Sequence, residues 1–232
     1  AYHLSKRFFD NSNSNNTNNK KIVLLEQNQL TSGTTWHAAG LMVTYGSMSP
    51  TSTGWRKYTK DLYQDVLSQE TNGEAETGFM DVGFIELATS DDHLHYYRRV
   101  AAFNRLHGID VQEISPSQVK EKSPLVETDD VLAGFYVPTD GRVNPTDATM
   151  SFVKACRQRG NVDFLEHTRV SSVITTNPFE TGKPKSVQGV TTECGKTFHS
   201  NVVVNCTGMW ARQLFENTGS NSSSSNNNNN NP

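Results

Sequence analysis

The sequence predicts an α/β fold into which a smaller α+β block is inserted, and three observations support this prediction. Helix and strand signals alternate at both ends of the 232-residue chain, whereas residues 76–140 mix short strands and helices. The apolar run Ile22–Leu25 lacks polar alternation, as expected for a central parallel strand that is buried on both faces. Glu26 follows this run directly. A strand that ends in a carboxylate is typical of the second strand of a dinucleotide-binding βαβ unit, where the acid accepts hydrogen bonds from a ribose.

The first half of the chain is predicted to begin with the end of a helix at residues 1–9, with apolar positions at Tyr2, Leu4 and Phe8. The strand Ile22–Leu25 follows. A second helix is predicted to end near Gly73, because apolar residues recur at helical spacing at Trp55, Tyr58, Leu62, Val66 and Leu67. Residues 84–89 are predicted to form a strand, and residues 93–106 a helix that Gly108 closes.

The second half continues with a helix that starts at Ser115, because Pro116 suits the first helical position and Gln118 is placed to complete a capping box. A strand at 135–137 runs into the turn 138–141, which marks a boundary. A further helix is predicted from Asn144-Pro145 to Gly160. Strands are then predicted at residues 162–165, 170–175, 187–191 and 202–204.

These elements suggest a nucleotide-binding domain made of residues 1–75 and 141–218, with residues 76–140 forming part of a substrate domain. Two Asn/Ser-rich tracts, at 10–19 and 219–232, have too little apolar surface to offset the entropy of ordering and are predicted to be disordered. The first is interpreted as an insertion in a surface loop, where added length costs little. Because no Gly-rich pyrophosphate loop precedes Glu26, the chain is interpreted as a fragment that is incomplete at both ends.

Composition limits the possible functions. The 21 Lys and Arg residues against 24 Asp and Glu residues give a net charge of −3, so no basic surplus indicates a nucleic-acid partner. No apolar run approaches the roughly 18 residues of a membrane span. The cysteines Cys156, Cys194 and Cys206 are far apart and form no CxxC pair, which argues against a zinc ribbon and for reduced thiols inside a cell.

The turn that follows the first strand carries the candidate chemistry. It holds a single Trp36-His37 pair between Gly33, Thr34 and Thr35 on one side and Ala38, Ala39, Gly40 and Leu41 on the other. Small residues allow the backbone to approach a flat cofactor closely. A histidine with a near-neutral pKa can act as a nucleophile through an unprotonated ring nitrogen. Taken alone, a single histidine is more often a packed or exposed side chain than a cofactor ligand.

This pattern resembles the flavin-linking motif of the dimethylglycine and sarcosine dehydrogenase family. The resemblance covers nearly all of residues 20–218. It includes Gln29–Leu41, Thr77-Gly78-Phe79 with Gly83-Phe84-Ile85, and Asp140–Pro145. The segment Val202–Ala211 resembles a strand and turn that pack against the cofactor in the wider amino-acid oxidase and glycine oxidase group. The family has a Rossmann-like FAD-binding domain of the D-amino-acid-oxidase type, and the same fold is expected here.

The resemblance also implies roles for individual residues. His37 would be bonded covalently to FAD through the methyl group at C8 of the ring. Glu26 would bind the adenosine ribose, with Leu25 beside it among the cofactor-binding residues. The residues from Gly33 to Leu41 would line the flavin, and the backbone of Val170 would meet the adenine. The implied reaction is oxidative demethylation of dimethylglycine or sarcosine by hydride transfer to the flavin. Family members reside in the mitochondrial matrix, pass electrons to an electron-transfer flavoprotein, and can pass the released carbon to tetrahydrofolate. No catalytic residue is assigned.

Two alternatives stay open at this stage. One is a homologue of the regulatory subunit of pyruvate dehydrogenase phosphatase, which has this architecture but lacks the Trp-His pair. The other is an amine oxidase that binds FAD without a covalent bond. Other features are given structural interpretations: His93 and His95 as a solvated helix start rather than a metal site, Cys206 as a packed thiol, and Asp140 and Asp147 as caps of turns and helices.

Overall fold

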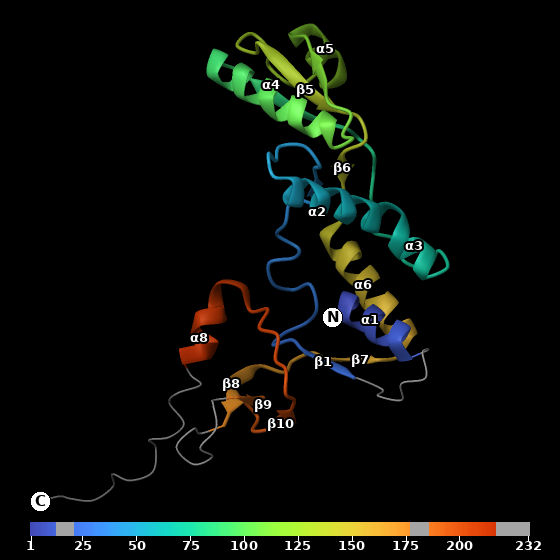
Figure 1. The fold of residues 1–232 in the computed structure, drawn as a ribbon, viewed down its shortest axis with the longest axis vertical. Helices are drawn as coiled ribbons and strands as arrows, with labels where there is room; N and C mark the ends of the chain where they lie inside the picture. The colour runs from blue at the N-terminus through green and yellow to red at the C-terminus, as the bar shows by residue number, and fades with distance from the viewer. Residues whose placement is uncertain (13–20, 177–185, 217–232) are drawn as a thin grey trace, which may run out of the picture. The chain divides into compact units, whose positions relative to one another are not determined.

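The computed structural model describes residues 1–12, 21–176 and 186–216 (Figure 1). The chain divides into two compact units. Unit 1 contains residues 1–22 and 33–162, and unit 2 contains residues 23–32 and 163–232. These units are defined by contacts, whereas the division into a nucleotide-binding and a substrate domain is a functional one and stays a prediction.

Unit 1 contains most of the helices. They are α1 (Tyr2–Ser12), α2 (Pro50–Asp61), the π-helical turn η1 (Leu62–Val66), α3 (Leu67–Glu70), α4 (Asp91–Leu106), α5 (Pro116–Lys122) and α6 (Pro145–Arg159). Its strands are β2 (Leu41–Met42), β3 (Phe84–Ala88), β4 (Gln112–Ile114), β5 (Ala133–Val137) and β6 (Gly141–Arg142).

Helix boundaries in unit 1 follow from local capping chemistry. The side chains of Ser49, Ser90 and Ser115 accept hydrogen bonds from the first turns of α2, α4 and α5, and the predicted capping box of α5 is complete. Asn144 caps α6, and Gly160 ends it in the left-handed conformation that glycine adopts without strain. The sequence signals at these positions are therefore confirmed.

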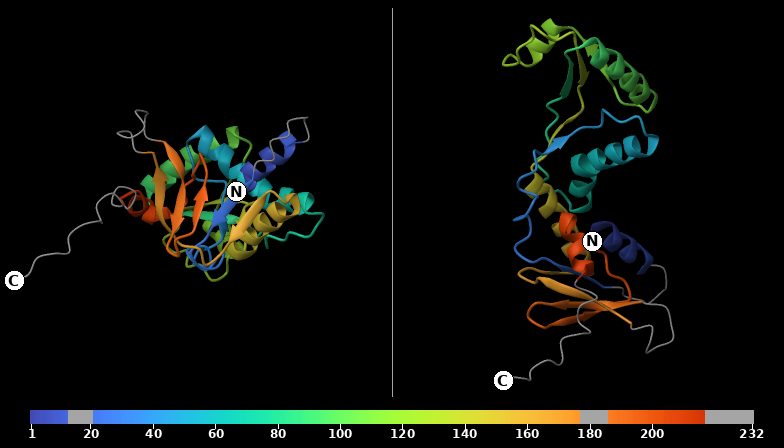
Figure 2. Two further views of the ribbon diagram at one scale, coloured as in Figure 1. Left: turned by 90° about the horizontal axis from the view of Figure 1, so that it is seen from below. Right: turned by 90° about the vertical axis from the view of Figure 1, so that its left-hand side faces the viewer.

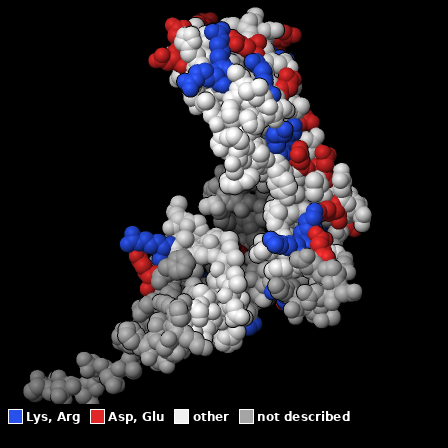
Figure 3. Space-filling view, viewed as in Figure 1, with Lys and Arg blue, Asp and Glu red and all other residues white. Residues whose placement is uncertain are grey.

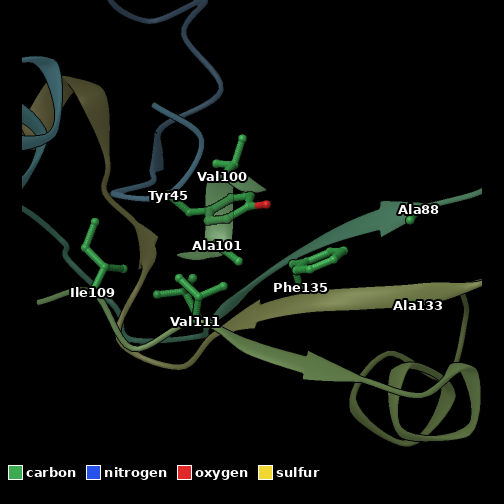
Figure 4. Packing of buried hydrophobic residues seen from close by; sticks show 9 residues of the cluster. Tyr45, Ala88, Val100, Ala101, Ile109, Val111, Ala133 and Phe135 are labelled. Carbon is green, nitrogen blue, oxygen red and sulfur yellow. The ribbon is translucent and has the colours of Figure 1, made fainter. Parts of the chain in front are cut away.

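An antiparallel sheet of order β3-β5-β4 forms the main core of unit 1. Alternate residues of β5 point to opposite faces, so Ala133, Phe135 and Val137 share one face and pack with Val100 and Ala101 of α4. Tyr45 stacks near Phe135 in this cluster, with ring centroids 6.4 Å apart (Figure 4). On the other face, Gly134 leaves room for Val119 of α5.

A second packing region joins α1, α3 and α6, and Figure 1 shows α1 beside α6. Ser5 donates a hydrogen bond to Asn161 at 2.6 Å, and the ring of Tyr2 meets Phe152 edge-on. Glu70 accepts hydrogen bonds from Tyr2, Lys6 and Arg159, so a single carboxylate connects all three helices.

Unit 2 is built from strands. The short strands β1 (Ile22–Leu25) and β7 (Val162–Leu165) pair with each other. The first residue of each strand, Ile22 or Val162, still belongs to unit 1, and the remaining residues belong to unit 2. An antiparallel sheet of order β10-β9-β8 follows, visible as adjacent orange strands in Figure 2. Its strands are β8 (Val170–Thr175), β9 (Val187–Thr192) and β10 (Thr197–His199), and the helices after them are η2 (Gly208–Trp210) and α8 (Ala211–Glu216).

The predicted elements up to residue 192 are confirmed, with three corrections in their detail. First, β1 is not buried on both faces: Val23 is exposed, so the described residues leave the face that carries this side chain partly uncovered. Second, Trp55, Tyr58 and Leu4 are exposed although helical spacing placed them on apolar faces. The side chains of these helical segments that are buried include Tyr2, Ser5, Leu62 and Leu67.

The third correction concerns the first Asn/Ser-rich tract. Asp10–Ser12 belong to α1 rather than to a disordered segment. Extending a formed helix by one turn fixes few residues per added hydrogen bond, so weak helix formers can follow a packed helix. The rest of this tract, residues 13–19, and the tail at 219–232 lie outside the described residues.

One predicted strand is absent. Residues 202–204 lie in no strand, and Val202 and Val204 are exposed. A strand requires a hydrogen-bonded neighbour, and none of the described strands pairs with this segment. Cys206, predicted to pack as a small apolar side chain behind that strand, is exposed for the same reason.

Candidate functional site

The Trp36-His37 turn lies on the surface of unit 1. Gly33, Thr34, Ala38 and Ala39 are exposed, and the larger apolar side chains of the turn are open to solvent as well. Trp36 is 61% exposed and Leu41 is 69% exposed. Apolar side chains with this much free surface are available to cover a flat ligand.

Local contacts fix the conformation of the turn. The backbone N–H of Ala38 donates to the carbonyl of Thr35 at 3.1 Å, and the rings of Trp36 and His37 lie with centroids 3.8 Å apart. Nδ1 of His37 is 3.0 Å from the carbonyl oxygen of Gly33. A carbonyl oxygen can only accept, so Nδ1 carries the proton in this hydrogen bond. In the neutral ring, Nε2 is then the nitrogen that keeps a free lone pair.

The end of the turn is fixed to residues 140–143. The N–H of Val143 donates to the carbonyl of Gly40 at 2.8 Å, and β2 then pairs with β6. Gly40 has φ +72°, and a Cβ there would lie 2.3 Å from the Val143 carbonyl oxygen. Only glycine fits this approach without displacing the backbone.

Asp140 completes this attachment and is fully buried. Its carboxylate accepts the Thr44 N–H at 2.8 Å, the Thr44 hydroxyl at 2.6 Å and the Tyr45 N–H at 3.4 Å. Asp140 was predicted to cap a turn or helix nearby, but its carboxylate instead binds a segment 95–96 residues away, a structural role rather than a catalytic one. Asp147 lies in the exposed first turn of α6, where a carboxylate suits the helix N-terminus.

Glu26 lies at the end of β1 in unit 2 and is half-buried. Its Oε1 atom accepts the N–H of Asn28 at 2.9 Å, while its backbone bonds to Leu165 and to Thr168. The following loop returns to the end of β7, where Glu166 accepts the N–H of Leu30 at 2.6 Å. The two carboxylates therefore lie on one loop cluster at the ends of two paired strands.

Val170 begins β8 close to this cluster and is half-buried. The N–H of Thr168, two residues earlier, donates to the Glu26 carbonyl at 2.7 Å. A β-bulge separates Val170 from Ser172, so the strand is irregular where the adenine contact is predicted. Arg169 forms an exposed ion pair with Glu193 at 3.1 Å.

The structure thus gathers the predicted site residues in two groups. Leu25, Glu26 and Val170 lie together in unit 2, and the residues from Gly33 to Leu41 lie together in unit 1. Their predicted contacts with a cofactor stay predictions.

Sequence reasoning missed two residues that shape these groups. Thr44 donates two of the three hydrogen bonds that the Asp140 carboxylate accepts, and nothing in its sequence neighbourhood marked it. Glu166 follows β7 as Glu26 follows β1. That repeated acid after an apolar run was a usable signal, because adjacent parallel strands end at one edge of a sheet.

Other features have a more limited bearing on function. On the face in Figure 3, side chains of both signs are mixed over the part that holds α4 and α5. His93 and His95 are exposed, and no group of three or more potential metal-binding side chains occurs among the described residues. No helix within the described ranges is long and apolar enough to span a membrane. A cavity of about 390 Å³ between β3 and α5 includes none of the predicted site residues.

Comparison with known proteins defines the class. The family described as FAD dependent oxidoreductase (DAO) matches residues 1–224. The chain belongs to this family, and its fold is the D-amino-acid-oxidase type of FAD-binding fold. Solved structures show the same fold. L-proline dehydrogenase from P. horikoshii matches with a TM-score of 0.75 and 22% identity, covering 92% of this chain and 51% of that one. Glycine oxidase from Bacillus cereus matches with a TM-score of 0.67 and 21% identity, covering 90% and 53%.

Curated relatives are similar at higher identity. Mitochondrial sarcosine dehydrogenase of Mus musculus is 32% identical over 193 residues, which are 83% of this chain and 20% of the relative. Mitochondrial dimethylglycine dehydrogenase of Rattus norvegicus is 29% identical over 218 residues, 92% and 22% of the two chains. The mitochondrial pyruvate dehydrogenase phosphatase regulatory subunit of Mus musculus is 33% identical over 214 residues, 92% and 22%. The chain spans about a fifth of the length of these relatives.

Proposed function

We propose that this chain is the flavin-linking part of an FAD-dependent dehydrogenase of N-methylated amino acids, with His37 as the covalent attachment point. The observation that carries this proposal is the hydrogen bond from Nδ1 of His37 to the Gly33 carbonyl. In the neutral ring, this hydrogen bond leaves Nε2 as the unprotonated, nucleophilic nitrogen of an exposed side chain. The family match supports FAD as the cofactor.

The residues of the turn fit a flat ring system. A Cβ built on Gly33 meets no atom within 4 Å, so space beside this backbone is open. The exposed alanines and the exposed faces of Trp36 and Leu41 offer apolar surface next to that space. Glu26 has one carboxylate oxygen engaged by Asn28, and the other suits a ribose hydroxyl. The Val170 backbone is proposed to meet the adenine.

The chemistry of the reaction comes from the cofactor. When bound, FAD supplies the two-electron oxidation of a C–N bond. Its net result here would be loss of an N-methyl group, because a hydride leaves the methyl carbon and water then releases that carbon as formaldehyde. In this proposal the described residues bind the cofactor and carry out no chemistry of their own: Glu26 binds the ribose, and the His37 turn holds the flavin ring.

The substrate proposal rests on the relatives. Sarcosine, dimethylglycine and the 4-methylaminobutanoate of a 31% identical oxidase from Paenarthrobacter nicotinovorans all carry N-methyl groups on an amino acid. We therefore propose sarcosine or dimethylglycine as the substrate. By the same resemblance we propose an electron-transfer flavoprotein as electron acceptor, tetrahydrofolate as a possible carbon acceptor, and a mitochondrial location.

The test is a search for acid-stable flavin. The natural protein that carries this sequence is precipitated in acid and washed, and flavin absorbance is measured in the pellet before the adduct is mapped by peptide mass spectrometry. The expected result is flavin on the peptide that contains His37, and its complete loss in H37A. H93A is the matched control, because His93 is also an exposed histidine but lies on α4.

A colourless pellet contradicts covalent attachment. FAD recovered in the supernatant would then indicate an oxidase with dissociable flavin. A protein without any flavin would instead favour a role like that of the regulatory relative.

A further inference from the structure

Asp140, a fully buried carboxylate of unit 1, binds the segment that follows the His37 turn and the short strand β2. Asp140 has no exposed surface, and its three hydrogen bonds all go to Thr44 and Tyr45. Burying a carboxylate is costly unless its oxygens are well satisfied. Two backbone N–H groups and one hydroxyl satisfy this one, and they belong to a segment nearly a hundred residues away in the sequence.

Residues 40–45 are attached to residues 140–143 at several successive points, and the contact with Asp140 is the last of them. Starting from the turn, the Gly40 carbonyl binds Val143, then β2 pairs with β6 at Leu41–Arg142 and Met42–Gly141, and then Thr44 and Tyr45 bind Asp140. Gly141 in turn lies against Met80, where a Cβ would come within 1.9 Å of a backbone oxygen. We call residues 140–143 the anchor segment.

His37 is three residues from the first attachment to this anchor segment. Before that point, the turn is held by its own hydrogen bonds from His37 to Gly33 and from Ala38 to Thr35. The anchored residues 40–45 fix the end of the turn to unit 1.

We propose that Asp140 is a positioning residue for the covalent attachment of FAD at His37. This inference rests on the proposed function. In the attachment, a bond forms between Nε2 of His37 and the C8 methyl carbon, and one C–H bond of that methyl breaks. Its two electrons reduce the flavin. The flavin takes up two protons, which balance the one lost from the methyl and the one lost from Nδ1. Dioxygen then reoxidises the flavin, giving hydrogen peroxide.

Such a step depends on a close approach between two atoms. Small misplacements of a reacting group reduce rates strongly, because the reactive geometry is then populated only rarely. Removing the Asp140 carboxylate leaves the N–H and hydroxyl of Thr44 and the N–H of Tyr45 without their acceptor. This loosens the segment that follows β2 and, through β2, the end of the turn. Binding of FAD itself, which involves many other contacts, depends less on this geometry.

The experiment measures the rate of covalent incorporation separately from binding. Protein produced without flavin is mixed with FAD. Total bound flavin is measured after native gel filtration, and covalent flavin is measured after acid precipitation, as functions of time. For D140A we expect covalent incorporation to slow by roughly tenfold or more, with total flavin binding changed less than about threefold. D147A is the matched control, an exposed carboxylate seven residues later, and is expected to incorporate flavin at the wild-type rate.

The conservative variant D140N separates positioning from charge. Its amide oxygen can still accept the two backbone N–H bonds and its NH₂ group can donate to the Thr44 hydroxyl, so most of the wild-type rate should return. T44V removes one of the three hydrogen bonds, keeps the shape, and should slow incorporation less than D140A. T44V serves as the test if D140A does not fold.

The outcomes are distinct. A wild-type protein that never acquires covalent flavin overturns the proposed function and this inference with it. A covalently flavinylated wild type with D140A or T44V at the same rate overturns the inference alone. Equal slowing in D140N and D140A also overturns it, because charge rather than positioning would then be responsible.

Discussion

At the scale of single residues, backbone geometry explains why some small residues of the turn are required and others are open to a ligand. Gly40 combines a positive φ with a contact that leaves no room for a side chain. Gly33, seven residues earlier, has neither constraint. The sequence pattern treats the two glycines alike, whereas the structure gives them different roles.

This contrast predicts different effects on stability. Gly40→Ala should lower the free energy of unfolding by about 2 kcal/mol or more, because it adds strain at positive φ to a clash with the Val143 carbonyl. Gly33→Ala should change it by less than about 0.5 kcal/mol. Urea denaturation of the flavin-free chain, followed by circular dichroism, measures both. An equal loss of unfolding free energy in the two variants would show that the close contact at Gly40 does not destabilise the alanine variant.

At the scale of elements, the packing of α1, α3 and α6 depends on one half-buried carboxylate. Burial alone would raise the pKa of Glu70, but hydrogen bonds from Lys6 and Tyr2 and the charges of Arg159 and Lys6 outweigh it and lower that pKa. Burial and the same hydrogen bond raise the pKa of the Tyr2 hydroxyl. The helices are thus connected most strongly when Glu70 is ionised.

The sign of the pH effect follows from linkage. Because the folded-state pKa of Glu70 is lowered, its contribution is fully present above the ordinary glutamate pKa of about 4.3 and is lost as the pH falls through the folded value. We expect E70Q to cost about 1–3 kcal/mol at pH 7, since Arg159 loses its charged partner, and to weaken the pH dependence of stability in acid.

The matched control for E70Q is E74Q, in the exposed pair of Glu74 with Lys154 at 3.3 Å, where the expected cost is about 0–1 kcal/mol. Denaturation curves between pH 3 and pH 7 give the comparison. An unchanged acid slope in E70Q would mean that Glu70 does not control the pH response.

At the scale of the whole chain, the two units have separate buried residues. Phe135 is fully buried in the core of unit 1 (Figure 4), and Val190 is buried in the sheet of unit 2. Because local stability follows the packing around each residue, a core defect should be felt mainly within its own unit.

Hydrogen exchange tests this separation. Phe135→Ala removes a large side chain from a packed core and should cost about 3–5 kcal/mol, with faster exchange in peptides from residues 84–137. Peptides from residues 187–199 should keep their protection. Val190→Ala should give the converse pattern. Faster exchange across both regions in either variant would show that the units unfold together.

The predictable part of the fold was the part with local causes. Capping residues such as Ser115 and Asn144, and the αL glycine Gly160, set helix ends through bonds within a few residues. The strands predicted at residues 84–89 and 135–137 correspond to β3 and β5, and Gly108 marked the end of α4. The Trp36-His37 turn was also found from sequence, because its composition is unusual and resembles a known motif.

The sequence by itself therefore determined the order of most elements, the fold class and the candidate flavin turn. Tertiary structure decided which apolar residues are buried, since burial depends on what packs against them: Trp55 and Val202 look like core residues in sequence and are exposed. It also decided that Asp140 holds Thr44, a contact across 96 positions. Periodicity and capping act between neighbours in sequence, whereas burial and a long-range hydrogen bond exist only after the chain has brought distant residues together.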